Sequence, residues 1–328
     1  MEAAGGIVVG LTGASGYIGG LLLDRLLADP GVAEVRSVAR RPVRRRHVRS
    51  GRLVHLCADL RDAEAPRALE GVDILYHLAA QVWAGQGPAA LPQMRAVNVD
   101  GTRNVLRAAP AAVVLASSAS VYGAWPDNPL PLHEDYPARP NPECPYAAHK
   151  LASEEVCAEL ARSWTVVRLA AVLGPHADAR VARAVRGYRV DVPAVRGAPQ
   201  AVQWLDEGDA VEGLLAAGRD LKGARQAEAQ VVNVATTDWL TSTDTARLAH
   251  SRPVELPRPF LIGASALGRR LGLAPFGADR ACLVGGPLAL SVVKAEELLG
   301  WRPTRTSAQV LAEALERDWR LSPRLRPL

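Results

Sequence analysis

The chain has 328 residues, of which 48% are hydrophobic and 22% charged, a composition typical of a folded globular protein that needs no disulfides to hold its core. Its formal net charge is +5, and the basic residues include a run of arginines between Arg40 and Arg49. Because neither interleaved aromatic residues nor a recognition helix accompanies that run, we expect no nucleic-acid partner.

Predicted strands and helices alternate from the start of the chain. An apolar run over Ile7–Thr12 ends in a glycine turn, and leucines at helical spacing follow it as far as Pro30. Further strands are predicted over Val35–Ala39, Leu53–Cys57, Ile74–Leu78, Val113–Ala116 and Val166–Leu169, with helices over Val97–Ala108 and Tyr146–Ala161. This alternation predicts an α/β fold, a Rossmann-type doubly wound parallel sheet.

The pattern changes after Gly174-Pro175, where the chain becomes rich in arginine and interrupted by prolines. A helix is predicted over Asp206–Ala217, and a strand over Val231–Ala235 is expected to rejoin the main sheet. From Thr241 onward, helices alternate with Pro-rich connections. We predict a dinucleotide-binding domain over residues 1–174, which 203–236 rejoin, and a smaller, mostly helical substrate-binding lobe over residues 175–328.

The cysteines and the hydropathy pattern bear on location. The spacing of the four cysteines fits neither a zinc motif nor a CxxC pair, and no cluster of ligands suggests a metal. No stretch approaches the ~20 apolar residues that a membrane span needs. We therefore expect a cytoplasmic protein with no metal and no membrane partner.

The segment TGASGYIGG places Gly13, Gly16 and Gly19 between a predicted strand and a predicted helix. Glycines there permit a tight turn, a close approach to a pyrophosphate, and packing of the helix on the strand. The positive end of the helix attracts the phosphates. We predict that this turn binds a dinucleotide, with Ser15, Tyr17 and Ile18 beside it.

The end of the second predicted strand bears on which dinucleotide binds. An NAD site usually has an acidic residue there for the ribose 2′-hydroxyl, whereas this chain has Arg40 and Arg41. Guanidinium groups suit a phosphate, so NADP (NADPH) is predicted and NAD is less favoured, unless the arginines form only a solvated loop. Asp59, after the third strand, is interpreted either as an acceptor for the adenine amino group or as a helix cap.

Tyr146 and Lys150 are four residues apart on a predicted helix, so they share one face. A nearby ammonium favours the ionised form of a tyrosine, which then becomes an acid or base closer to neutral pH. Ser117 and Ser118 follow the fifth strand, at the edge where ligands of such sheets bind. One of them could hold a substrate carbonyl; the alternative is a turn or cap.

These motifs occur together with the ADL at Asp59, HLAA at His77–Ala80, NVDGTRNVL from Asn98, SSASVYG and YAAHK. In this order they resemble the extended short-chain dehydrogenase/reductase family, the NAD(P)-dependent epimerase/dehydratase group. Later segments, VVRLAAVLGP, QWLDEGDAVEG and LGWRPTRT, are similar to the family's as well. The resemblance covers nearly the whole chain.

The resemblance implies a role for each matching residue. Tyr146 would be the catalytic acid/base, Lys150 would bind the nicotinamide ribose, Ser118 would orient the substrate, and Asn98 would brace the adjoining helix. It implies cofactor contacts at Leu60, Leu78, Ala79 and Ala80, and substrate contacts at Gln81, Trp83, Ser118, Tyr146 and Leu173. His176 follows Gly174-Pro175 near the expected substrate lobe and could touch a substrate, but a surface histidine is the favoured interpretation. It also implies a homodimer and a small-molecule substrate.

One departure from the family pattern bears on the substrate. Members that act on nucleotide sugars usually carry RxxNxxGP, and Ala171 stands here in place of the asparagine. We therefore predict an NADP-dependent oxidoreductase of the ketoreductase type, which transfers a hydride to or from a small carbonyl or hydroxyl substrate. The alternative is an NAD(P)-dependent epimerase of a nucleotide sugar that recycles its cofactor in place. A non-catalytic redox sensor is disfavoured by the intact Ser-Tyr-Lys set.

Overall fold

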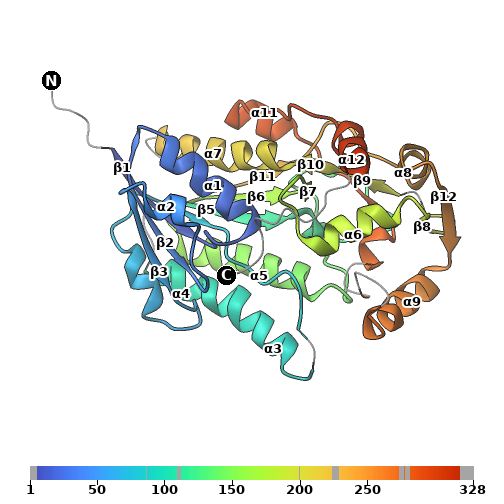
Figure 1. Ribbon diagram of the computed structural model, residues 1–328, viewed down its shortest axis with the longest axis horizontal. Helices are drawn as coiled ribbons and strands as arrows, with labels where there is room; N and C mark the ends of the chain where they lie inside the picture. The colour runs from blue at the N-terminus through green and yellow to red at the C-terminus, as the bar shows by residue number, and fades with distance from the viewer. Residues whose placement is uncertain are drawn as a thin grey trace.

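The computed structural model describes residues 6–85, 87–108, 112–198, 200–223, 229–272, 277 and 281–317. Its centre is a seven-stranded parallel sheet with the order β11-β6-β5-β4-β1-β2-β3 (Figure 1). The strands are β1 (Ile7–Thr12), β2 (Val32–Ala39), β3 (Leu53–Cys57), β4 (Ile74–His77), β5 (Ala112–Ser118), β6 (Ser163–Leu169) and β11 (Gln230–Val234). Because the order reverses between β1 and β4, this is a doubly wound sheet, and the predicted α/β class is confirmed.

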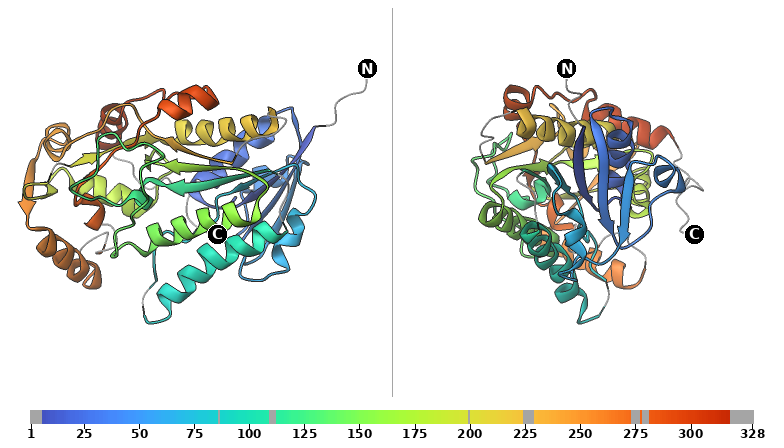
Figure 2. Two further views of the ribbon diagram at one scale, coloured as in Figure 1. Left: turned by 180° about the vertical axis from the view of Figure 1, so that it is seen from behind. Right: turned by 90° about the vertical axis from the view of Figure 1, so that its left-hand side faces the viewer.

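Helices cover both faces of the sheet. The helices α1 (Tyr17–Ala28), α7 (Glu207–Gly223) and α11 (Val293–Leu299) lie on one face, and α3 (Ala90–Arg95), α4 (Gly101–Arg107) and α5 (Pro145–Leu160) lie on the other (Figures 1 and 2). A π-helical turn, η2 (Ala96–Asp100), joins α3 to α4. The helix predicted from Val97 therefore begins earlier, because Pro92 falls in its first turn, where a missing N–H costs no hydrogen bond.

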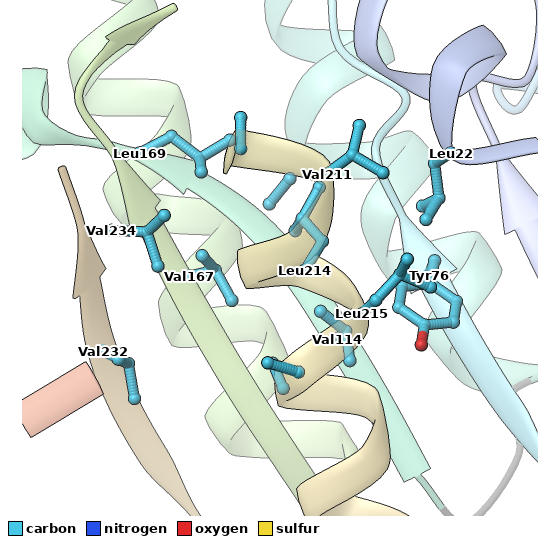
Figure 3. Close-up of a cluster of buried hydrophobic side chains, with 14 of the residues drawn as sticks. Leu22, Tyr76, Val114, Val167, Leu169, Val211, Leu214, Leu215, Val232 and Val234 are labelled. Atoms are coloured by element: carbon cyan, nitrogen blue, oxygen red, sulfur yellow. The ribbon is translucent and has the colours of Figure 1, made fainter. Parts of the chain in front are cut away.

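The largest apolar core lies between the sheet and α7. Figure 3 shows Leu214 of α7 packed over Val114 and Val167, with Val232 and Val234 beside them. These five side chains are fully buried. Since each contributes roughly 1.5–3 kcal/mol by leaving water, this layer fixes the strands whose carboxyl ends carry the site.

The remaining elements gather at one end of the sheet and are named here the C-terminal lobe (Figure 1). Its helices are α6 (Ala179–Gly187), α8 (Ser242–Leu248), α9 (Arg258–Arg270) and α12 (Ser307–Glu316). Short parallel strands pair as β7 (Ala171–Leu173) with β10 (Trp204–Asp206), β8 (Asp191–Val195) with β12 (Arg252–Leu256), and β9 (Ala201–Val202) with β13 (Pro287–Leu288). Such short strands leave no readable periodicity, and prolines within them disfavour a strand prediction.

Short helical turns complete the chain: α2 (Arg45–Val48), η1 (Ala65–Leu69), η3 (Ala119–Tyr122) and η4 (Cys282–Val284). The strand predicted to rejoin the sheet does so as β11, which pairs in parallel with β6. The division into two domains stays a prediction. Among the helices in the described ranges, none combines the length and hydropathy needed to cross a membrane.

Candidate active site

The glycine turn after β1 brings three pieces of backbone into close contact. Gly13 has φ +76°, and a Cβ there would lie 2.9 Å from the Ala79 nitrogen of the loop after β4. A Cβ on Gly19 would overlap the Gly13 carbonyl oxygen. Gly16 is the N-cap of α1 and provides no side-chain cap, so the first turn of the helix keeps its N–H groups for another acceptor. The turn therefore fits a bound pyrophosphate.

A pocket of about 120 Å³ adjoins this turn and is named here the cofactor pocket. It is formed at the carboxyl ends of β1 to β4, the expected position for a ligand of a doubly wound sheet. The predicted cofactor residues that line it are Gly13, Ser15, Gly16, Arg40, Arg41, Asp59, Leu60, Leu78, Ala79 and Ala80. Val38, Ala39, Ala58 and Val97 complete the lining.

Asp59 carries a charge into this pocket. Its carboxylate accepts from the Arg61 backbone N–H at 3.0 Å and pairs with the Arg61 guanidinium at 2.9 Å. The hydrogen bond from the Arg61 side chain lowers the pKa of Asp59, despite the opposing effect of partial burial. Asp59 therefore stabilises a turn, and it contributes an ionised carboxylate to the pocket instead of capping a helix.

Tyr17 and Ile18 do not line the cofactor pocket. The Tyr17 hydroxyl donates to Glu207 Oε2 at 2.6 Å, and Ile18 packs against the main core. Burial, followed by the Glu207 charge, raises the pKa of Tyr17, so the phenol stays a donor. The side chains of Tyr17 and Ile18 therefore face away from the cofactor pocket, and a cofactor contact at either residue, which stays a prediction, would use a backbone N–H of the first turn of α1.

The two serines at the end of β5 differ in burial and in hydrogen-bond partners. Ser117 is buried, and its hydroxyl donates to the Glu154 carboxylate of α5. Ser118 is half-buried and accepts hydrogen bonds from the Ser120 backbone at 3.2 Å and the Ser120 hydroxyl at 2.9 Å. Ser118 is therefore the more accessible of the two, and its hydroxyl caps η3, which is the alternative that the sequence left open; its contact with a ligand stays a prediction.

Lys150 lies beneath this edge with only 4% of its surface exposed. Its ammonium donates to the Ala116 carbonyl of β5 at 2.6 Å and lies 6.0 Å from the centre of the Tyr146 ring. Burial lowers the pKa of Lys150 to about 8, and the Glu154 charge opposes that effect. The half-buried Tyr146 thus has a cation next to it, which is the arrangement that favours a proton-transferring tyrosine.

Asn98 holds the loop that follows β4. Its side-chain oxygen accepts from the Gln81 N–H at 2.6 Å, and its amide donates to the Gln81 carbonyl at 2.9 Å. The π-helical turn leaves the Asn98 carbonyl open to the hydroxyls of Thr102 and Ser153. Asn98 is buried and makes no contact of the kind that a proton carrier needs, so it positions the loop.

A cleft of about 550 Å³, named here the Tyr146 cleft, lies beside Tyr146 at the start of α5. This volume is typical of a small-molecule site. Its lining includes the predicted residues Trp83 and Tyr146, together with Leu91, Met94, Glu143, Pro145, Arg269 and Arg270. The Arg180 guanidinium lies 5.2 Å from the centre of the Trp83 ring, a cation–π distance. The sequence did not single out Arg269 and Arg270, because arginines recur throughout the chain.

Three predicted substrate contacts lie elsewhere or act indirectly. The Leu173 side chain is fully buried among apolar residues of the C-terminal lobe, so a substrate contact does not fit its placement. His176 binds Glu207 at 2.6 Å and lines a separate cavity of about 340 Å³ beside Tyr17. Gln81 donates its side-chain amide to the Trp83 carbonyl at 3.0 Å and so shapes the wall of the Tyr146 cleft.

Among the residues whose placement is described, no group of three histidine, cysteine or acidic side chains could hold a metal ion. Two buried acidic residues that the sequence did not single out join other elements. Glu154 pairs with Arg168, and Glu207 joins Tyr17 to His176.

Comparison with known proteins bears on this arrangement. Residues 9–235 match the NAD dependent epimerase/dehydratase family. The chain is 27% identical over 317 residues to the uncharacterized protein Rv0501 of Mycobacterium tuberculosis, covering 92% of this chain and 81% of that one. It is 36% identical over 154 residues to UDP-glucose 4-epimerase of Mycolicibacterium smegmatis, covering 44% and 48%. The solved structure of MoeE5 in complex with UDP-glucuronic acid and NAD superposes with a TM-score of 0.69 at 25% identity, covering 95% and 98%.

Proposed function

The chain belongs to the NAD dependent epimerase/dehydratase family, and we propose that it is an NAD(P)-dependent epimerase of a sugar attached to a nucleotide diphosphate. The observation that carries this proposal is the composition of the Tyr146 cleft. Arg269 and Arg270 line the same cleft as Tyr146, and paired guanidiniums suit phosphate oxygens. The similarity to UDP-glucose 4-epimerase supports the same substrate class.

This proposal reverses the order of preference that the sequence suggested. Ala171 had argued against a nucleotide sugar, but its side chain is exposed on β7, and it is not among the residues that line the Tyr146 cleft. The loss of an asparagine there therefore removes no donor from the cleft wall. The charge for a diphosphate is supplied instead from α9, through Arg269 and Arg270.

In the proposed reaction the protein moves a proton and holds the substrate. Tyr146 takes the proton of a sugar hydroxyl as it becomes a ketone and returns it when the ketone is reduced from the other face. Ser118 binds the same oxygen and keeps it near the phenol. Lys150 stabilises the tyrosinate between the two steps, because its charge lies beside the ring. When bound, the nicotinamide supplies the hydride acceptor and donor.

We also propose that NADP is the preferred cofactor. Arg40 and Arg41 line the cofactor pocket at the end of β2, where a 2′-phosphate would lie. The related structure of MoeE5 contains NAD, so the choice needs a direct test. A charge-assisted hydrogen bond contributes ~1.5–3 kcal/mol, so calorimetry should find NADPH bound about tenfold more tightly than NADH. Equal dissociation constants would refute the preference.

The test of the main proposal is incubation of the protein with UDP-glucose or UDP-galactose and catalytic NADP or NAD. Chromatography should detect the 4-epimer while the absorbance of reduced cofactor stays constant, because the hydride is returned. A Tyr146→Phe variant is the matched control and should form no epimer. Cofactor consumption without epimer formation would contradict the proposal.

A ketoreductase remains the second candidate, since Trp83, Leu91 and Met94 give the cleft an apolar wall. A wall of this kind favours a substrate with an apolar body. Stoichiometric oxidation of NADPH by aromatic or alicyclic ketones would promote this candidate. Absence of turnover with such ketones would remove it.

A further inference from the structure

A buried ion pair lies directly behind the catalytic edge and has no part in the proposed mechanism. Glu154 of α5 and Arg168 of β6 meet at 2.7 and 3.1 Å, and their exposed fractions are 7% and 6%. The Ser117 hydroxyl also donates to Glu154. Burying two charges is costly, and apolar residues often stabilise a fold as well or better. Such a pair is therefore a candidate for a functional role.

The position of Glu154 on its helix suggests that role. Tyr146, Lys150 and Glu154 are spaced by four residues on α5, so they follow one another along one face of the helix. The carboxylate acts on the Lys150 ammonium in the direction that favours the proton, against the effect of burial. Lys150 must be protonated to stabilise a tyrosinate by its charge, and in that form it has three N–H donors, enough for both Ala116 and a ribose hydroxyl.

Three other titratable side chains lie close to Lys150 or to the Glu154–Arg168 ion pair, and none of them supplies a negative charge. From β4, His77 is held neutral, because burial and then the Lys150 charge lower its pKa to about 3. Cys157, on the same helix, stays a thiol, because burial and then Glu154 raise its pKa to about 12. The Tyr122 ring faces the Arg168 guanidinium at 4.7 Å, and burial raises the pKa of this phenol.

We propose that Glu154 is a positioning residue whose carboxylate, on the same face of α5, helps to keep Lys150 protonated at neutral pH, and that Arg168 is its buried counter-ion. This inference about Glu154 rests on the proposed epimerase function in one respect: that function is what gives the charge of Lys150 a role in catalysis. The protonation itself can be measured without turnover.

The composition of the chain makes that measurement direct. It contains only three lysines, Lys150, Lys222 and Lys294, so protein labelled with ¹³C at the lysine ε-carbon gives three signals. Lys222→Arg and Lys294→Arg variants identify the Lys150 signal by elimination. The ¹³C chemical shift of the Lys150 ε-carbon is followed from pH 6 to 11, and its midpoint gives the pKa of Lys150. The wild-type midpoint is expected near pH 8, and Glu154→Gln should lower it by about one unit, as loss of a nearby opposite charge does.

Two further variants separate charge from folding. Glu154→Gln leaves Arg168 buried and unpaired, so this variant alone can fail to fold. The double variant Glu154→Gln/Arg168→Met removes both charges and should fold, and its Lys150 midpoint should stay lowered. The matched control is Glu159→Gln, an exposed carboxylate on the same helix that pairs with Arg103 at 2.8 Å. This control should leave the Lys150 midpoint unchanged.

The outcomes distinguish the two proposals. If the midpoint in the folded double variant equals that of the wild type, Glu154 only satisfies Arg168 and the inference is overturned. A lowered midpoint supports it whether or not the protein epimerises UDP-glucose. If epimerase activity is found, the alkaline limb of its kcat/KM profile should move to lower pH by the same amount. If no epimerase activity is found, the proposed function fails and the role of Glu154 stands.

Discussion

The contact between Gly19 and the glycine turn provides a test of the cofactor site. In a Gly19→Ala variant, the new Cβ would overlap the Gly13 carbonyl oxygen and lie 2.8 Å from the Gly13 carbonyl carbon. Both atoms belong to backbone, so no side chain can rotate away. Either α1 moves off β1 or the glycine turn, where we expect the pyrophosphate to bind, changes shape. We therefore expect both stability and cofactor affinity to fall.

The neighbouring Gly20 provides the matched control. A Cβ there would lie 3.6 Å from the Ala14 carbonyl oxygen, an ordinary contact. Alanine in a helix is favoured over glycine by ~0.8–1 kcal/mol, and this gain applies to both variants. The difference between the two therefore isolates the steric cost, about 1–3 kcal/mol for overpacking against rigid surroundings. Gly20→Ala should be as stable as the wild type or slightly more so.

Urea unfolding measures the stability difference, and calorimetry with NADPH measures affinity. A shift of the turn that loses one charge-assisted hydrogen bond to a phosphate costs ~1.5–3 kcal/mol, which is at least about tenfold in Kd. Gly20→Ala should keep the wild-type Kd. If Gly19→Ala unfolds at the same urea concentration as Gly20→Ala and binds NADPH equally well, the close approach of α1 to the turn is refuted.

Four other expectations follow. Tyr146→Phe should reduce epimerisation by ~10²–10⁴-fold with little change in the calorimetric Kd for NADPH; turnover at the wild-type rate would remove Tyr146 from the mechanism. Asn98→Ala leaves two polar groups of Gln81 without partners and should destabilise by ~1–3 kcal/mol; an unchanged urea midpoint would contradict this. The pKa of His77 falls from 6.5 to about 3, so stability should be complete above pH 6.5 and decline toward pH 3 by up to roughly 4–5 kcal/mol. That decline should be shallower in His77→Gln, and equal slopes would exclude His77 as its cause. Light scattering should find the homodimer that the family resemblance implies, and a monomer at micromolar concentration would exclude it.

The central sheet could be predicted because its inner strands, such as β4 and β5, are buried and read as nearly continuous apolar runs. The ends of the strands were less certain where polar residues occur. The fifth strand was expected to stop at Ala116, whereas β5 continues through Ser117 and Ser118. Ser117 can end a buried strand because Glu154, 37 residues later, accepts its hydrogen bond. That partner is not visible in a local window.

The site was predicted where a short motif carries its own geometry. The glycine turn and the YxxxK pair are local, and their residues lie where the spacing indicated. Of the residues that line the Tyr146 cleft, Trp83 and Tyr146 were predicted, whereas Glu143 and Arg269 were not, because they come from segments far apart in the sequence and carry no distinctive pattern. The spacing of Glu154, one helical turn beyond Lys150, could have identified it as a residue of the same face.

The contacts of Glu207 could not be predicted from the sequence, because its partners lie far away along the chain. Its carboxylate binds the Tyr17 hydroxyl from 190 residues away and both the backbone and the ring of His176. A Cβ on Gly174 would overlap the Glu207 side chain, so the glycine of the Gly174-Pro175 pair is needed to admit the carboxylate. Each residue has an ordinary local explanation: an aromatic after a glycine turn, a histidine in a loop, an acidic residue at a helix start. Their contact, which no local sequence window shows, joins the glycine turn after β1 to the start of the C-terminal lobe.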